Sequence, residues 1–281
     1  MWSAATPGLA AEGLRGSQWE PALSRVPGCE SAPPLAVEPL AGGTANVSYR
    51  VRSLQGWFVV RLHRPYAPEL GVDRRREARL HAAAAAAGLA PAILAADPGG
   101  SFLVTEYADA RRWDSEDMED PERLMLLART LGRLHALPAP QTPAFDLATL
   151  AAGHVAAIVR TEPAAAGVLG PLLVRAQGIL AEQTAAARPH CIVHNDLNHA
   201  NLLGEAPLYL IDWEYAAVAD PLSDLACLVA YYPQLMSQLP LLLAESGLAA
   251  TPGQLRQAAW VYSLISDLWH RRVQLAAAAG A

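Results

Sequence analysis

The spacing of apolar residues changes along the chain. Before residue 107, apolar residues occur in short runs rich in β-branched and aromatic side chains, bounded by glycine and proline, which is typical of strands. These runs cover 35–51, with a glycine turn inside, then 56–62, 91–94 and 102–107. After residue 120, apolar residues recur every three or four positions, which is typical of helices. The spacing predicts one helix that begins at Asp120. It predicts further helical stretches over roughly 146–187, 221–245 and 252–279.

One further helix is predicted among the strands of the first half. Residues 73–87 are rich in alanine and arginine and stop at Gly88, a helix C-terminal signal. Its arginines at positions 74, 75, 76 and 79 are interpreted as one solvated face.

The helix that begins at Asp120 has recognisable end signals. Asp120 is an N-cap residue, and Pro121 with Glu122 suits a first turn. The expected core stripe consists of Leu124, Leu127, Leu131 and Leu134. The acidic segment 109–120, around Trp113, is interpreted as a solvated linker, in preference to a gate that attracts a cationic substrate.

The segment 194–212 carries the candidate chemistry. Two short apolar runs, 202–203 and 208–211, flank residues 204–207 and predict a β-hairpin. Antiparallel pairing brings Asp212 back beside Asn201, so that two oxygen donors face one gap, as a magnesium ion requires. Asp196, five residues before Asn201, is placed to accept a hydroxyl proton as a general base.

A competing interpretation is a metallohydrolase. His190, Cys191, His194 and His199 lie close in sequence, and histidine and cysteine bind transition metals well. Neighbouring residues on a strand point to opposite faces, however, and no second cluster completes a coordination shell. The phosphoryl-transfer interpretation is therefore preferred.

The motif 194–201 with Ile-Asp-Trp-Glu-Tyr at 211–215 resembles the choline/ethanolamine kinase and aminoglycoside phosphotransferase family, closest to choline and thiamine kinases. The resemblance runs from about Leu35 to the end of the chain. It implies an α+β, protein-kinase-like bilobal fold that uses ATP and magnesium. The implied divisions are an irregular lead-in at 1–34, a small β-rich N-lobe at 35–107 and a larger, mostly helical C-lobe at 108–281.

The resemblance also implies the nucleotide-binding residues. The chain has no lysine, which excludes a Walker-type P-loop, so Arg61 takes the phosphate-binding role with Glu77 as its partner. Glycines let backbone N–H groups approach phosphate closely, and Glu106 and Ala108 mark backbone groups for adenine. The complete implied set is Gly42, Gly43, Thr44, Asn46, Arg61, Glu77, Glu106 and Ala108.

Aromatic residues concentrate in the last third of the chain and suggest a pocket for a cation. The acceptor-binding candidates are Asp196, Trp213, Glu214, Tyr215, Trp260 and Asp267. Helical spacing assigns Tyr262, Ile265, Trp269 and Val273 to the core instead. His194 and Asp224 are assigned structural roles. The resemblance implies that Asp224 braces the catalytic loop, residues 194–201, and an acid at a helix N-terminus is the simpler explanation of Asp224.

The expected acceptor is the alcohol of choline, ethanolamine or thiamine, with an amino sugar or aminoglycoside as the alternative. A catalytically silent nucleotide-binding module is the alternative of another class. Such modules usually lack the base or a metal ligand, whereas this chain has all three.

Composition narrows the partners. A chain of 281 residues with 52% hydrophobic and 17% charged residues is globular, and its net charge of −6 argues against nucleic acid. Three cysteines without framework spacing suggest reduced thiols in the cytoplasm. No run is expected to reach the roughly 18 apolar residues that span a membrane.

Overall fold

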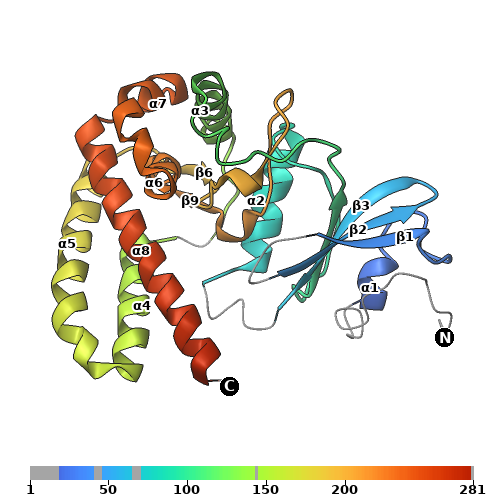
Figure 1. The fold of residues 1–281 in the computed structure, drawn as a ribbon, viewed down its shortest axis with the longest axis horizontal. Coiled ribbons are helices and arrows are strands. Elements are labelled where there is room, and N and C mark those ends of the chain that lie inside the picture. The colour runs from blue at the N-terminus through green and yellow to red at the C-terminus, as the bar shows by residue number, and fades with distance from the viewer. Residues whose placement is uncertain (1–18, 41–45, 65–70, 143–144, 280–281) are drawn as a thin grey trace. The chain divides into compact units, whose positions relative to one another are not determined.

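The computed structural model describes residues 19–40, 46–64, 71–142 and 145–279. The chain forms two compact units, residues 1–110 and 111–281, and each is considered by itself. Figure 1 follows the chain from the blue strands of the first unit to the yellow and red helices of the second. An antiparallel sheet together with a larger set of helices confirms the predicted α+β class.

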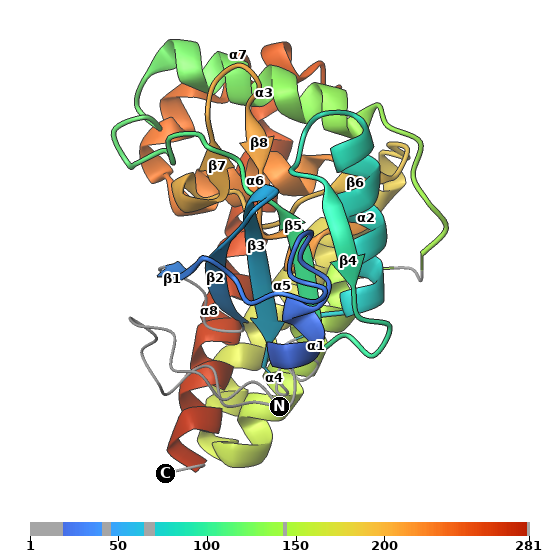
Figure 2. The ribbon, with the colours of Figure 1, turned by 90° about the vertical axis from the view of Figure 1, so that its right-hand side faces the viewer.

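The first unit is built on a five-stranded antiparallel sheet with the strand order β1-β2-β3-β5-β4 (Figure 2). The strands are β1 (Ala36–Leu40), β2 (Asn46–Ser53), β3 (Gly56–His63), β4 (Ile93–Ala96) and β5 (Phe102–Glu106). Alternate side chains of β2, β3 and β5 point into the core, where Val51, Val60 and Val104 are fully buried. The predicted strands are confirmed where the structure describes them, except that β4 lies two residues later than the predicted run 91–94.

Residues 19–29 extend the core of this unit beyond its sheet. Composition predicts an irregular or partly helical lead-in over residues 1–34, and its helix α1 (Trp19–Leu23) packs against β3 and β5. The Trp19 ring meets the Tyr49 ring edge-on, with centroids 5.2 Å apart. A helix this short shows no periodicity in the sequence, so its tertiary packing could not be foreseen.

Helix α2 (Arg74–Ala86) follows its end signals. The Asp73 carboxylate caps it by accepting hydrogen bonds from the Arg75 and Arg76 amides. Leu80 is fully buried on its inner face. Gly88, with φ of 71°, continues the chain in the left-handed conformation that glycine tolerates. The predicted helix 73–87 is thereby confirmed.

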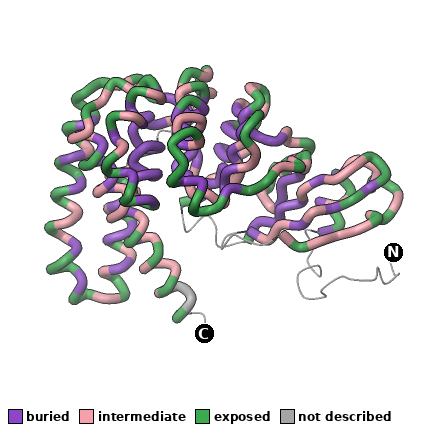
Figure 3. Tube along the Cα trace, turned by 45° about the horizontal axis from the view of Figure 1, so that its top comes forward, coloured by how far each residue is buried: buried purple, intermediate pink, exposed green. Residues whose placement is uncertain are grey.

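The second unit is mostly helical. Its helices are α3 (Pro121–His135), α4 (Leu147–Thr161), α5 (Ala166–Ala185), α6 (Leu222–Tyr231), α7 (Leu239–Ser246) and α8 (Pro252–Ala279), with short 3-10 turns η2 (Pro163–Ala165) and η5 (Pro233–Gln238). All four leucines of the stripe predicted in α3 are fully buried. Buried and exposed positions alternate around these helices (Figure 3).

Most acidic residues of the segment before α3 are exposed, as predicted, but the segment is anchored by buried residues that a solvated linker would lack. Trp113 is buried, and its indole N–H donates to the Gly204 carbonyl over 2.8 Å. The buried Asp117 carboxylate pairs with the guanidinium groups of Arg111 and Arg123. Sequence showed the excess of acid but not the two arginines that neutralise this carboxylate.

By length and composition, one helical segment among the described residues could cross a membrane: Pro163–Ala185, with a mean hydropathy of 1.5. The expectation that no run is long and apolar enough is therefore wrong, because alanine, glycine and leucine fill this segment. One such helix is weak evidence, since helices of soluble proteins pass the same test. Within the unit, α5 packs against α4 and α8.

Candidate active site

In the first unit, two arginines converge on the buried Glu77 carboxylate. The Arg61 guanidinium pairs with Glu77 Oε1, as the sequence predicts, and Arg74 Nη1 donates to Oε2 over 2.7 Å. Only 1% of the Glu77 side chain is exposed. Burial by itself raises the pKa of this carboxyl group, but the charges of Arg61 and Arg74 outweigh burial and leave the pKa lowered. Glu77 is therefore ionised and holds both cations.

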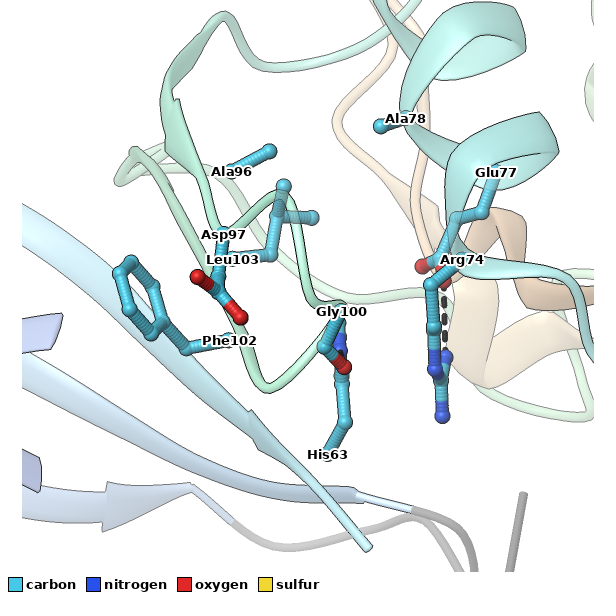
Figure 4. Close-up of a pocket in the computed structure, with 9 residues that line it drawn as sticks. All are labelled: His63, Arg74, Glu77, Ala78, Ala96, Asp97, Gly100, Phe102 and Leu103. Atoms are coloured by element: carbon cyan, nitrogen blue, oxygen red, sulfur yellow. Dashed lines mark hydrogen bonds and ion pairs between the residues drawn. The ribbon is translucent and has the colours of Figure 1, made fainter. Parts of the chain in front are cut away.

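Arg74 was not foreseen as a member of this cluster. Figure 4 shows its side chain descending from α2 with its ion pair to Glu77, near His63 at the end of β3. Arg74 Nη2 also donates to Asn46 Oδ1 over 2.8 Å, which places the buried Asn46 beside the cluster. The solvated face predicted for the α2 arginines is thus wrong for Arg74 and for the buried Arg76.

The remaining nucleotide-binding candidates are only partly described. Gly42, Gly43 and Thr44 lie outside the described residues. The Glu106 amide donates to the Ala92 carbonyl, and the Ala108 carbonyl accepts from the Ala110 amide. The Glu106 carbonyl also accepts from the Thr105 hydroxyl over 3.1 Å. That backbone groups near Glu106 and Ala108 bind adenine stays a prediction.

In the second unit, the catalytic loop follows β6 (Cys191–Val193), which pairs with β9 (Ala217–Ala219). The fully buried Asp224 on α6 fixes this loop: its carboxylate accepts hydrogen bonds from the His194 and Asn195 amides at 2.8 to 3.1 Å. His135, at the end of α3, donates from Nε2 to Asp224 over 2.9 Å. Asp224 thus holds the backbone of the catalytic loop through its carboxylate. His135 is a hydrogen-bond partner of Asp224 that the sequence did not reveal.

The His194 ring is held inside the loop. Its Nε2 lies 2.9 Å from the Ile211 carbonyl, which can only accept, so Nε2 carries the proton. Its Nδ1 then accepts from the Asp196 amide over 3.3 Å. The ring spans the loop and the chain leading to Asp212, and it packs edge-on against Trp213 with centroids 4.8 Å apart. This arrangement is structural.

Asp196, Asn201 and Asp212 come together as the sequence predicts. Asn201 Nδ2 donates to both the Asp196 carbonyl and Asp196 Oδ2, each over 2.8 Å. The predicted hairpin forms from β7 (Leu202–Leu203) and β8 (Tyr209–Leu210), and the Ile211 amide donates to the Asn201 carbonyl over 3.0 Å. The next residue is Asp212, so the hairpin brings the Asp212 backbone beside Asn201.

This donor set fits magnesium. Because Asn201 binds Asp196 through Nδ2, its amide oxygen Oδ1 is the atom that could coordinate a metal ion. Asp212 adds a carboxylate from a left-handed backbone conformation, with φ of 64° and ψ of 66°, which is uncommon outside glycine. Hard oxygen donors at this spacing suit Mg²⁺, with phosphate oxygens and water completing the shell.

The metallohydrolase alternative finds no support among the described residues. No three His, Cys, Asp or Glu side chains there group as metal ligands. Of the four sequence candidates, His194 is engaged as described above, and His199 Nδ1 lies 2.7 Å from the Tyr232 hydroxyl. Burial raises the pKa of the Cys191 thiol, which disfavours the thiolate that zinc requires.

Two acceptor candidates of the sequence do not face a common site. The Arg175 guanidinium covers the Trp260 ring at 4.1 Å from its centroid, and Trp260 packs with the core between α4, α5 and α8. Asp267 is exposed on α8. Sequence could not show that a neighbouring helix covers Trp260 with the Arg175 cation while Asp267 stays exposed.

The residues after Asp212 form the turn η4 (Trp213–Tyr215) and are mostly interior. Trp213 is fully buried, and its indole N–H donates to the Leu210 carbonyl over 2.9 Å, so it is a core residue and not an acceptor contact. Glu214 is also buried. The Tyr215 ring meets the Trp269 ring edge-on at 6.3 Å, and its carbonyl accepts from Asn195 Nδ2.

Two tyrosines that were not selected from the sequence contact the catalytic loop. Tyr231 donates its hydroxyl to Asp196 Oδ1 over 2.9 Å. Tyr262, which helical spacing assigned to the core, donates to the Asn195 carbonyl over 2.5 Å. A usable signal existed for Tyr231, because it lies seven residues after Asp224 on α6 and therefore on the same helical face.

Comparison with known proteins places the chain in a family. The profile of the phosphotransferase enzyme family (APH) matches residues 36–258. The chain belongs to this family. It is therefore a small-molecule phosphotransferase, and the metal-site and base motifs described above lie within the matched region. No match was found among curated proteins.

Solved structures share the fold. Choline kinase LicA from Streptococcus pneumoniae is 21% identical, with a TM-score of 0.71, over 86% of each chain. A choline/ethanolamine kinase family protein from Mesorhizobium loti is 24% identical, with a TM-score of 0.71, over 92% of this chain and 84% of that one. APH(2")-IIIa, solved as its GDP and kanamycin complex, is 18% identical, with a TM-score of 0.64, over 92% of this chain and 96% of that one. The protein-kinase-like fold is thus confirmed.

Proposed function

We propose that this protein transfers the γ-phosphoryl group of ATP to the hydroxyl group of a small cationic alcohol of the choline, ethanolamine or thiamine type. Family membership supplies the reaction class. The observation that carries the proposal is the contact between Asp196 and Asn201, with Asp212 brought beside Asn201 by the hairpin. This arrangement joins a base to a set of metal-binding oxygens in one unit.

In the proposed reaction, the acceptor oxygen attacks the γ-phosphorus while Asp196 accepts the hydroxyl proton. The bond between the γ-phosphorus and the β,γ-bridging oxygen breaks, and ADP leaves with that oxygen. Asn201 and Asp212 would hold magnesium, which neutralises charge on the phosphates when bound. Asn201 also fixes the Asp196 carboxylate through its Nδ2 group, so one side chain serves both the base and the metal.

In the first unit, Arg61 is the proposed phosphate ligand. Glu77 holds its guanidinium group in place and is itself paired with Arg74, and a planar guanidinium binds phosphate through two parallel hydrogen bonds. Glu77 carries one charge against two arginines, so the three groups together keep a net positive charge for an anionic ligand. LicA has also been solved in complex with AMP, which supports an adenine nucleotide as co-substrate.

The choice of a cationic acceptor rests on the aromatic residues around Asp196. Tyr231 and Tyr262 contact the catalytic loop directly, and their rings lie edge-on with centroids 6.1 Å apart. Aromatic rings stabilise a desolvated cation by about 2 kcal/mol. Choline and ethanolamine kinases among the structural neighbours support this choice, whereas the kanamycin complex keeps an amino sugar as the second candidate.

The proposal is tested by measuring ADP release with choline, ethanolamine, thiamine and kanamycin as acceptors. We expect turnover with one of the first three. The Asp196→Asn variant should lose at least about 100-fold in kcat, the usual contribution of a general base, while binding ATP as the wild type does. Glu182→Gln on the exposed surface of α5 is the matched control and should retain full activity. Full activity of Asp196→Asn would reject the base assignment.

The silent-module alternative is separated by calorimetry. It predicts ATP binding by the wild-type protein without ADP release in the presence of any acceptor. Turnover that depends on Asp196 excludes it.

A further inference from the structure

The Asp196 carboxylate is surrounded by hydrogen-bond donors. Its Oδ1 atom accepts from the Tyr231 hydroxyl over 2.9 Å and from Asn198 Nδ2 over 3.2 Å, and its Oδ2 atom accepts from Asn201 Nδ2 over 2.8 Å. A carboxylate offers about four lone-pair sites. These three hydrogen bonds occupy most of those sites, and a general base needs one of them to accept the proton of its substrate.

The three donors differ in origin. Asn198 and Asn201 belong to the loop itself, two and five residues after Asp196, whereas Tyr231 reaches it from the last residue of α6, 35 positions away. Tyr231 also differs in chemistry, since it is an alcohol-like O–H that points at the base. Its 2.9 Å distance lies in the range of about 2.6 to 3.2 Å over which a general base takes a proton from its substrate.

Tyr231 can remain a donor without becoming a phenolate. Burial and then the nearby Asp196 charge raise the pKa of its hydroxyl. The residue is 39% exposed overall, and its ring is flanked by Tyr262 and Tyr232, with centroids 6.1 and 6.5 Å away. The Tyr262 ring is itself tied to the loop through the Asn195 carbonyl. Tyr231 is therefore the accessible member of this aromatic group.

We propose that the Tyr231 hydroxyl occupies the place of the acceptor hydroxyl on Asp196 Oδ1, and that an acceptor must displace it to be phosphorylated. This inference rests on the proposed function and assigns Tyr231 a role in selecting the acceptor over water. While Tyr231 holds Oδ1, a water molecule cannot use this oxygen to attack the γ-phosphorus, give its proton to Asp196 and release ADP and phosphate. An acceptor with an adjoining cation can displace the hydroxyl and contact the tyrosine ring.

The test is Tyr231→Phe, which removes one hydroxyl and keeps the ring. We expect ATP hydrolysis without acceptor to rise about tenfold, the effect of losing one hydrogen bond of about 1.4 kcal/mol. The acceptor KM should fall by a similar factor, with kcat for transfer within about twofold. Unchanged or slower hydrolysis, or a loss of transfer kcat with unchanged KM, would overturn the proposal and leave Tyr231 as a positioning residue for Asp196.

Two further variants test whether the effect comes from the Tyr231 hydroxyl and acts through Asp196. Tyr232→Phe removes the adjacent hydroxyl, which contacts the His199 amide and ring and not Asp196, so it should not increase hydrolysis. The double variant Asp196→Asn, Tyr231→Phe should abolish the added hydrolysis, and its persistence would also overturn the inference. Hydrolysis is measured without acceptor, so this comparison does not depend on which alcohol the protein phosphorylates. Failure to phosphorylate any of the proposed alcohols would refute the proposed acceptor class but not the role of Tyr231.

Discussion

Replacement of Asp224 tests how the catalytic loop is held. The buried carboxylate receives hydrogen bonds from the His194 amide, the Asn195 amide and His135 Nε2. Hydrogen bonds to a charged group contribute about 1.5 to 3 kcal/mol each, so Asp224→Ala should lower the free energy of unfolding by about 4.5 to 9 kcal/mol. This is a large share of the roughly 5 to 15 kcal/mol that stabilises a typical protein.

Asp224→Asn is the informative companion. Its amide oxygen can still accept from the two loop amides, and its NH₂ group can face His135 if that ring changes tautomer. We expect a loss of about 2 kcal/mol, because neutral bonds replace charge-assisted ones. Both variants should lower kcat, since Asp196 follows directly on the braced backbone.

The assay is urea unfolding followed by circular dichroism, alongside ADP release. Asp146→Ala is the control, because Asp146 is an exposed N-cap of α4 that also accepts two backbone amides and should cost only about 1 kcal/mol. The reasoning is refuted if Asp224→Ala unfolds within about 1 kcal/mol of the wild type and retains its kcat, because the loop would then hold its shape without this carboxylate.

Two other predictions concern packing and pH. A Cβ atom at Gly132 on α3 would lie 2.8 Å from the Ser246 carbonyl oxygen, so Gly132→Ala should lower the melting temperature, corresponding to about 1 to 3 kcal/mol. Gly153→Ala on α4 meets nothing within 4 Å and should stabilise by about 0.5 to 1 kcal/mol; equal effects of the two changes would contradict the packing argument. Burial, and then the Arg272 charge, lower the pKa of His154 from 6.5 to about 4, so the unfolded chain takes up this proton first and stability is lost as pH falls from about 6.5 to 4. His154→Gln should remove up to about 2.4 kcal/mol of that loss in unfolding measurements at pH 7 and 4.5, and an unchanged pH dependence would argue against a neutral His154.

Local patterns in the sequence predicted local structure well. The leucine stripe of α3 and the hairpin after Asn201 depend on spacing within a few residues, and both form as expected. The Arg61 and Glu77 pair spans 16 positions and was inferred from the family resemblance. The fold and the catalytic loop were therefore predictable from sequence.

Contacts between distant segments were not accessible. Sequence gives the position of Trp260 on its helix but not the Arg175 side chain that covers it from α5. Likewise, the acidic character of Asp117 is visible, but its burial between Arg111 and Arg123 depends on how the segment folds back. Aromatic content alone could not rank Tyr231 above Trp213, because the ranking depends on which ring reaches Asp196.

The three cysteines offer built-in reporters of local opening. Cys29 lies in the core of the first unit, and Cys191 and Cys227 lie in the core of the second. Burial raises the pKa of all three thiols, so a native molecule presents little thiolate to an alkylating reagent. Alkylation under native conditions must then follow transient unfolding, and peptide mapping of the modified cysteines would compare how often each unit opens.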